Sequence, residues 1–288
     1  MKPIDLFIVG GQKCGTTSLL RYLSQHPNIL GHSQMEMTYF SIDSEYKNGF
    51  KIAWRQYYKQ INTSKSFILG KNAHMYRNFK AITRLKIHNP NCVVLFLIRN
   101  PVDRAYSSYL REKSSWGEEY SFDEVVEKYL VDISNWRFRV YFELGIYHMF
   151  LEKIFEIFGE NVKVIKFSEL KDSPKVLIKN IYCELGIEDT FYPDFSKKYN
   201  VTKQSKSQWL AQQTSRILSE DNKLKITAKK YLPSSTTNMI GNALRSVNKS
   251  KKNYGPVSTN SRSILNEFYQ PCNDKLSLLL KEDFSQWK

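Results

Sequence analysis

The sequence predicts an α/β fold of three layers, in which a central parallel sheet is flanked by helices. A short apolar segment, residues 7–9, leads through a loop with three glycines into a helix that opens at Thr16. A second apolar run, residues 92–98, is typical of a central parallel strand that is buried on both faces. Helical patterns between the apolar runs favour strand–helix–strand units. We therefore expect one domain over residues 1–288.

The remaining elements follow from apolar periodicity and capping residues. The pattern predicts helices over residues 16–25, 46–61, 78–88, 121–130, 142–158, 174–185 and 259–280, and strands over 67–69 and 162–167. The helix from 121 opens on a capping box, with serine at its start and glutamate three residues later.

The bulk composition limits the class of protein. A chain of 288 residues with 41% apolar residues can bury a full core. Its longest wholly apolar run, 92–98, is far too short to span a bilayer, and no signal peptide precedes Asp5, so we expect a soluble, cytoplasmic protein. The four cysteines lack metal-ligand spacing, which predicts reduced thiols and no metal site. Cys14, in the glycine loop, is the candidate for a reactive thiol.

The positive charge is concentrated in one stretch. Residues 196–252 carry thirteen Lys or Arg against two acidic residues, which is eleven of the fifteen net positive charges. Such a stretch faces an anionic partner or stays solvated. Nucleic acid is not favoured, because no zinc-finger, helix-turn-helix or aromatic RNA-binding pattern accompanies the charge. We expect a basic lid or acceptor-binding region at about 196–256, facing a polyanionic nucleotide and an acceptor that itself carries negative charge.

The glycine loop, residues 10–17, has the features of an anion-binding site. Its glycines let the backbone come close to a ligand, and the helix that follows presents free N–H groups and the positive end of its dipole. Gly10 and Gly15 are spaced as in a Walker A loop, but Thr16 stands where a nucleotide triphosphatase needs lysine. The lysine of this loop, Lys13, is suited to the bridging oxygen next to a 5′-phosphate. The fold is thus P-loop-like, and the alternative is a tight turn that binds nothing.

A second candidate phosphate site follows the strand 92–98. Arg99 stands at the carboxyl end of this strand, where open α/β sheets bind their ligands, so Arg99 and the loop 10–17 should open on the same crevice. Ser107 lies eight residues further on, in a helix. A guanidinium donates two parallel hydrogen bonds to a phosphate, and a serine hydroxyl adds a third donor. An ion pair between Arg99 and Asp103 is the alternative.

Together these motifs resemble the sulfotransferases that use 3′-phosphoadenosine 5′-phosphosulfate (PAPS), and most closely their bacterial and heparan-type branch. In that family the loop binds the 5′-phosphosulfate, and an arginine and a serine at this spacing hold the 3′-phosphate. The resemblance implies PAPS as cofactor, 3′,5′-adenosine bisphosphate as product and no metal. It implies nucleotide binding by Arg99, by Ser107 and by the loop residues Gly11, Gln12, Lys13, Cys14, Gly15, Thr16, Thr17 and Ser18.

The resemblance also implies two catalytic residues. The family carries an acidic residue just before an aromatic pair, and here Glu36 precedes Tyr39 and Phe40, although Met35 replaces the usual lysine. Glu36 would take the proton of an acceptor hydroxyl or amine, while Lys13 stabilises charge on the departing 5′-phosphate. The acceptor is a small molecule, a sugar or a lipid. A solvated surface glutamate is the alternative role for Glu36.

Other positions are ambiguous. Lys71, Asn72 and Arg111 depart from the family pattern, so the resemblance assigns them no role, and His74 is either an acceptor contact or an ordinary loop histidine. Lys251 and Lys252 stand where the family folds a basic loop over the 3′-phosphate; a solvated surface loop is the alternative. Trp209 either stacks near the nucleotide or anchors a lid helix.

Two other functions stay open at this point. A P-loop kinase or nucleotide triphosphatase is the nearest enzyme, although no carboxylate is obviously placed to hold Mg²⁺. A non-catalytic basic module would bind an anionic glycan or nucleic acid through residues 196–252.

Overall fold

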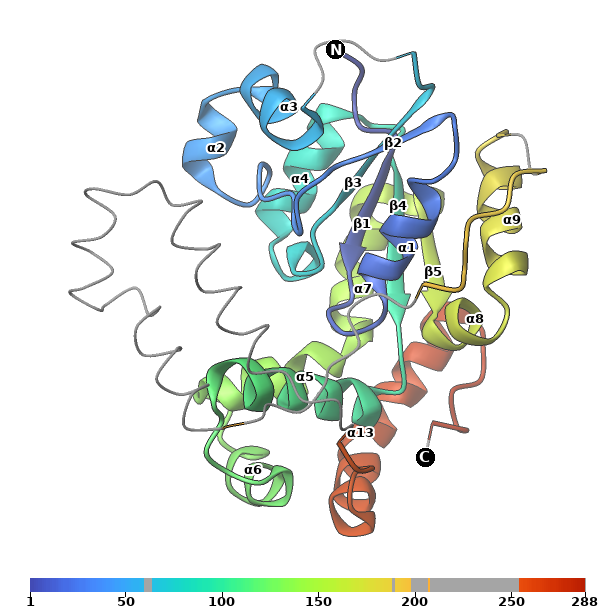
Figure 1. The fold of residues 1–288 in the computed structure, drawn as a ribbon. Coiled ribbons are helices and arrows are strands. Elements are labelled where there is room, and N and C mark those ends of the chain that lie inside the picture. The colour runs from blue at the N-terminus through green and yellow to red at the C-terminus, as the bar shows by residue number, and fades with distance from the viewer. Residues whose placement is uncertain (60–63, 188–189, 198–206, 208–253, 288) are drawn as a thin grey trace. The chain divides into compact units, whose positions relative to one another are not determined.

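The structure, a computed structural model, describes residues 1–59, 64–187, 190–197, 207 and 254–287. Five strands form one sheet in the order β2-β3-β1-β4-β5, and every neighbouring pair is parallel (Figure 1). In chain order the strands are β1 (Leu6–Gly10), β2 (Ile29–Gly31), β3 (Phe67–Lys71), β4 (Val93–Ile98) and β5 (Val162–Lys166). The predicted α/β fold with a central parallel sheet is confirmed.

The central strands are buried because their side chains are apolar on both faces. Every residue of β1 is buried, and so is every residue of β4 except the first. Helix α1 lies on one face of the sheet, and α4 and α7 lie on the other (Figure 1). This placement agrees with right-handed crossovers, because the chain runs outward to β2 and then returns past β1 to β4.

The described residues form two compact units. The first comprises Met1–Pro101, Ile146–Asn200 and Tyr269–Trp287, and it contains the whole sheet. The second comprises Val102–Gly145 and, of the later chain, the described residues 207 and 254–268. A single domain over the whole chain stays a prediction. No helix within the described ranges is long and apolar enough to cross a membrane.

The helices of the first unit cover and connect the strands. They are α1 (Thr16–Leu23), α2 (Asp43–Lys47), α3 (Phe50–Tyr58), η1 (Met75–Arg77), α4 (Phe79–His88), α7 (Tyr147–Phe158), η4 (Gly159–Asn161), α8 (Phe167–Asp172) and α9 (Pro174–Glu184). The single helix predicted over 46–61 is wrong, since the segment divides into α2 and α3 at Gly49, whose φ of 83° lies in the left-handed region. The helix predicted from 142 begins only at Tyr147.

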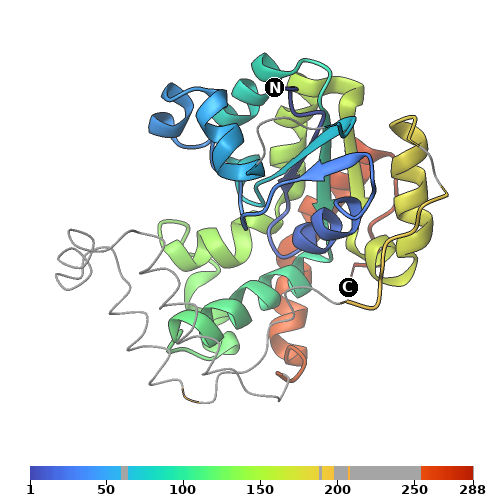
Figure 2. The same cartoon turned by 45° about the horizontal axis from the view of Figure 1, so that its top comes forward.

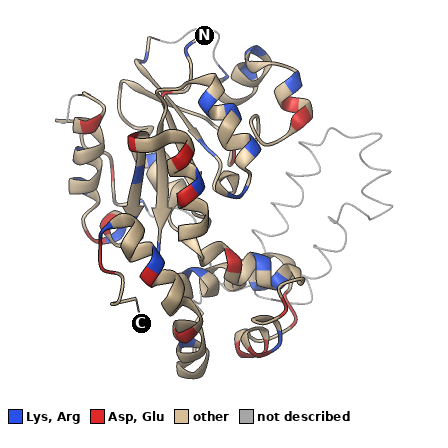
Figure 3. Ribbon diagram, turned by 180° about the vertical axis from the view of Figure 1, so that it is seen from behind, with Lys and Arg blue, Asp and Glu red and all other residues tan. Residues whose placement is uncertain are grey.

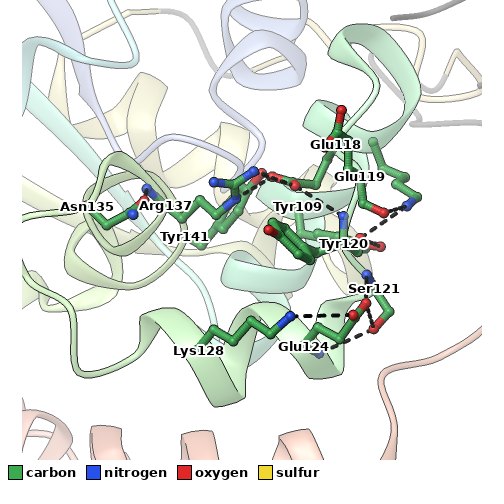
Figure 4. Close-up of polar contacts among 11 residues, drawn as sticks. Tyr109, Glu118, Glu119, Tyr120, Ser121, Glu124, Lys128, Asn135, Arg137 and Tyr141 are labelled. Atoms are coloured by element: carbon green, nitrogen blue, oxygen red, sulfur yellow. Dashed lines mark hydrogen bonds and ion pairs between the residues drawn. The ribbon is translucent and has the colours of Figure 1, made fainter. Parts of the chain in front are cut away.

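The second unit is built from α5 (Pro101–Trp116, from Val102 onward), α6 (Phe122–Tyr129), the short turns η2 (Phe138–Phe142) and η3 (Glu143–Gly145), and the start of α13 (Thr259–Leu280). The predicted capping box at Ser121 is confirmed, with both reciprocal hydrogen bonds to Glu124 present (Figure 4). A buried carboxylate organises the centre of this unit. Glu118 accepts two hydrogen bonds from Arg137, at 3.0 and 2.9 Å, and one from the Tyr141 hydroxyl at 2.8 Å (Figure 4).

Charged residues of both signs are interspersed over the helices that the structure describes (Figure 3). The strongly basic stretch 196–252 lies almost entirely outside the described residues. A second view of the same fold shows the strands passing between their covering helices (Figure 2).

Candidate functional site

The strand order places four candidate segments at one edge of the sheet. The chain passes from β3 to β4 across β1, which makes the carboxyl end of β1 the switch point where such sheets bind ligands. The loop 10–17 leaves β1 there, Glu36 follows β2, Lys71 ends β3 and Arg99 follows β4. All four belong to the first unit.

The loop 10–17 has the conformation of a phosphate cradle. Lys13 and Gly15 take positive φ angles of 68° and 91°, and the N-cap residue of α1 is Gly15, which has no side chain to cap the first turn. That turn also lacks acidic residues, so its N–H groups and its dipole favour an anion. A side chain at Gly15 would meet α8, because a Cβ atom there would lie 2.7 Å from Leu170 Cδ2. Glycine is required at this position by both the φ angle and the packing.

Arg99 joins the loop, as the order of the strands predicts. Its Nη1 donates to the carbonyl oxygen of Lys13 at 3.3 Å, and the guanidinium carbon lies 4.7 Å from the centre of the Phe167 ring. Tyr147 holds the backbone of Arg99, since its hydroxyl donates to the Arg99 carbonyl oxygen at 2.9 Å. Asp103, the alternative partner, accepts a hydrogen bond from Arg262 at 2.6 Å. Arg99 and the loop are therefore in direct contact at this edge of the sheet.

Two loop side chains turn inward. The Cys14 thiol is fully buried, with Sγ 3.5 Å from the Tyr147 hydroxyl, so the expectation of a reactive thiol is wrong. Gln12 is also buried, and its Oε1 has no hydrogen-bond partner among the described residues. An orphaned polar atom inside a phosphate-type loop is consistent with a site that a bound polar ligand completes.

A buried lysine links Glu36 to the loop. Lys71 Nζ donates to Glu36 Oε1 at 2.9 Å and to Thr17 Oγ1 at 3.2 Å. The backbone N–H of Ala73 donates to the other Glu36 oxygen at 2.8 Å. The Lys71 side chain is 0% exposed and that of Glu36 is 25% exposed, so Glu36 is a held carboxylate with one accessible edge and not a solvated surface residue. Burial lowers the pKa of Lys71, while the charge of Glu36 opposes that change.

Sequence reasoning missed Lys71. Its strand was expected to end at residue 69, whereas β3 continues to Lys71, which pairs in register with Ile8 of β1. A signal was present, because a lysine at the end of a buried strand is tolerated inside a protein only when it is paired.

His32 is a second buried group near this cluster. It is 1% exposed, and neither ring nitrogen has a hydrogen-bond partner among the described residues. Burial, reinforced by the charge of Lys71, lowers the pKa of His32 to about 4. The ring is therefore neutral at physiological pH.

The other predicted residues are placed as follows. Ser107 lies half-buried on α5, in the second unit, and its predicted role with Arg99 stays a prediction. Trp209, Lys251 and Lys252 lie outside the described residues. Met35 is 69% exposed, and Arg111 bonds with its neighbour Glu112 at 3.1 Å. In the described part of the chain, no group of three or more His, Cys, Asp or Glu is arranged to hold a metal ion.

Comparisons with known proteins identify the family of this chain. The family model described as "Sulfotransferase domain" matches residues 3–231. The membrane-associated sulfotransferase kil1 of Dictyostelium discoideum is 30% identical in an alignment of 131 residues, and the match covers 43% of this chain and 27% of that protein. The human bifunctional heparan sulfate N-deacetylase/N-sulfotransferase 3 is 24% identical in an alignment of 283 residues, and the match covers 95% of this chain and 29% of that protein. This chain thus spans less than a third of the length of these curated relatives.

A solved structure shares the fold. The crystal structure of a sulfotransferase from Alicyclobacillus acidocaldarius superimposes with a TM-score of 0.68 at 23% identity, and the match covers 100% of this chain and 99% of that one.

Proposed function

The chain belongs to the sulfotransferase domain family, and on that premise we propose that it transfers a sulfuryl group from PAPS to a hydroxyl or amine of an acceptor. One observation carries the proposal beyond the family: Lys71 connects the candidate base, Glu36, to Thr17 of the phosphate loop. A base that is tied to the donor site lies close to the place where an attacking acceptor must lose its proton.

The residues divide the work of the reaction. PAPS supplies a sulfuryl group on a phosphate leaving group; the new bond forms between the acceptor atom and sulfur as the bond from sulfur to the 5′-phosphate oxygen breaks. Glu36 accepts the proton of the acceptor hydroxyl or amine through its exposed edge. Lys13, with Thr16, Thr17 and the N–H groups at the start of α1, stabilises the charge that builds on the phosphate.

Lys71 keeps Glu36 in working position. Its ammonium, fully buried, neutralises the carboxylate and fixes Oε1, while the Ala73 N–H fixes Oε2. The link to Thr17 then sets the position of the base relative to the loop. Arg99 and Ser107 are proposed to hold the 3′-phosphate, with Trp209, Lys251 and Lys252 as further nucleotide contacts.

The acceptor is the open part of the proposal. The human relative is named for heparan sulfate N-sulfation, which favours trying amino sugars first. An acceptor that carries negative charge suits the basic stretch 196–252. A cytoplasmic location stays a prediction.

The test is to incubate the protein with labelled PAPS and an extract of its source, and to identify the sulfated product by mass. We expect Lys13→Ala to lower turnover about 100-fold or more, with a smaller loss of affinity for 3′,5′-adenosine bisphosphate. Lys153→Ala is the matched control, since this lysine is 54% exposed and pairs with Glu156 on α7. Unchanged turnover in Lys13→Ala contradicts the role given to that residue.

The same preparation separates the rival functions. Mg²⁺-dependent ATP hydrolysis without binding of 3′,5′-adenosine bisphosphate favours a kinase or triphosphatase. Salt-sensitive polyanion binding that survives Lys13→Ala and Glu36→Gln, with no sulfated product, favours a basic binding module.

A further inference from the structure

The segment that carries Glu36 is fastened on both sides by the last turn of α3. Before Glu36, the backbone N–H and the hydroxyl of Ser33 both donate to the carbonyl oxygen of Tyr57, at 3.1 and 3.2 Å. After Glu36, the backbone N–H of Thr38 donates to the Tyr57 hydroxyl at 3.0 Å. One tyrosine therefore contacts the chain three residues before the base and two residues after it.

The direction of the Tyr57 hydroxyl is set by a carboxylate. The hydroxyl donates to Glu45 Oε2 at 2.9 Å, and Thr38 Oγ1 donates to both oxygens of the same carboxylate, at 2.9 and 3.1 Å. The Tyr57 hydroxyl also lies 2.8 Å from Thr38 Oγ1. Because the hydroxyl has one proton and donates it to Glu45, its oxygen accepts the hydrogen bond from the Thr38 backbone N–H. Tyr57 is 1% exposed and its partners Thr38 and Glu45 are half-buried, so water has limited access to these bonds.

This fastening bears directly on the geometry of the base. Glu36 can act as the base only where its two carboxylate oxygens contact Lys71 and the Ala73 N–H. The next residue adds a backbone contact, since the Met37 N–H donates to the Lys71 carbonyl oxygen at 2.7 Å. A catalytic group must be held to about 0.5 Å, and a displacement of about 1 Å can cost roughly 100-fold in rate. Residues that fix the segment on both sides of Glu36 thus control its reactivity without touching a substrate.

We propose that Tyr57, oriented by Glu45, is a positioning residue for Glu36. The inference rests on the proposed sulfuryl transfer, but the contacts that carry it lie outside the nucleotide loop. It predicts a loss of turnover without a loss of nucleotide affinity, because Tyr57 contacts the segment that carries Glu36 and takes no part in the hydrogen bonds described above for the loop 10–17.

The experiment compares Tyr57→Phe with a matched control, Tyr141→Phe. Tyr141 is fully buried and donates to Glu118 at 2.8 Å, as Tyr57 donates to Glu45, but it lies in the second unit (Figure 4). Both variants lose one hydrogen bond from a buried tyrosine to a carboxylate, and Tyr57→Phe also loses the contacts of the hydroxyl with Thr38. We measure hydrogen–deuterium exchange of residues 32–42, affinity for 3′,5′-adenosine bisphosphate, and sulfuryl transfer from labelled PAPS to the source extract.

The expected result is specific to Tyr57→Phe. Exchange over residues 37–42 becomes about tenfold faster and turnover falls about tenfold, while affinity for the bisphosphate stays within about twofold. Residues 32–35 keep their exchange rate, because Ser33 bonds to the backbone carbonyl of residue 57, which phenylalanine retains. Tyr141→Phe changes none of the three. If Tyr57→Phe does not fold, Glu45→Gln gives the same readout, because it weakens the acceptor that orients the hydroxyl.

Two results overturn the inference: unchanged exchange and turnover in Tyr57→Phe, or equal losses in Tyr141→Phe. A wild-type protein that transfers no sulfuryl group to any component of the extract refutes the proposed function instead. In that case the exchange measurement still decides whether Tyr57 holds the segment.

Discussion

Replacing Glu36 alone should lower the free energy of unfolding by more than replacing both members of the Glu36–Lys71 pair. In Glu36→Gln the ammonium of Lys71, which is 0% exposed, keeps only Thr17 Oγ1 and an amide oxygen as partners. Stranding a buried charge in this way costs about 3–5 kcal/mol. The cost of Glu36→Gln cannot exceed about 5 kcal/mol, because Lys71 would then release its proton and become neutral. That value is the free energy of deprotonating an ordinary lysine at pH 7.

The other two variants should cost much less. Lys71→Met removes the buried charge and leaves Glu36 with the Ala73 N–H and access to water through its 25% exposed side chain, for which we expect about 1 kcal/mol. The double variant contains neither charge, and replacement of a buried ion pair by uncharged groups is often close to neutral. Adding Lys71→Met to Glu36→Gln should therefore restore most of that loss, about 3 kcal/mol or more.

Urea denaturation of the four proteins at pH 7 measures these differences. The pH dependence gives an independent check on Glu36→Gln. The pKa of Lys71 is already lowered by burial, and without Glu36 it falls further, so the unfolded chain binds more protons than the folded one up to about pH 10. The stability of Glu36→Gln should then rise relative to wild type between pH 7 and 9.5. Additive losses, or a Glu36→Gln variant as stable as wild type, would refute the reasoning.

Two further predictions concern single residues near the site. Gly15→Ala should lower the unfolding free energy by about 2 kcal/mol or more, because it combines a φ of 91° with a Cβ atom 2.7 Å from Leu170. Gly49→Ala, with a φ of 83° and no atom within 4 Å of the added Cβ, should lose only the backbone share of about 1 kcal/mol. The pKa of His32 is about 4 in the folded protein, below its value in the unfolded chain, so the unfolded chain takes up this proton first as pH falls. The free energy of unfolding should therefore decrease by up to about 3 kcal/mol between pH 6.5 and pH 4. His32→Leu should remove that part of the loss.

These two predictions are checked by the same denaturation curves. Equal losses in Gly15→Ala and Gly49→Ala would show that α8 yields to the added methyl group. Identical pH dependence in wild type and His32→Leu would show that the ring takes up its proton without cost, for example by turning toward water.

Local patterns in the sequence were enough to place much of this site. The glycine loop, the buried run ending at Arg99 and the acid before the aromatic pair each lie within a short segment, and parallel strands bring their carboxyl ends to one edge. The ion pair between Glu36 and Lys71 joins residues 35 positions apart. Helix and strand periodicity relates only residues that are close in the sequence, so it could not predict this pair. The same reason explains Tyr57, whose spacing indicates only a packed helix face.

The two wrong helix predictions have local causes that periodicity alone does not detect. Gly49 interrupts a pattern that otherwise reads as one helix, because its left-handed backbone conformation ends α2 and begins α3. Before α7, the short turns η2 and η3 keep apolar residues buried without regular α-helical geometry, so the buried pattern extends beyond the helix itself.

The packing of α8 beneath the phosphate loop has a thermodynamic consequence for ligand capture. Leu170 lies against Gly15, and the Phe167 ring lies under the guanidinium of Arg99, so the loop and its arginine are supported from below. A surface that is already in its binding shape loses little conformational entropy when an anion arrives. Anion binding at this loop should then require little rearrangement of the protein, whereas an unsupported loop would first have to be ordered.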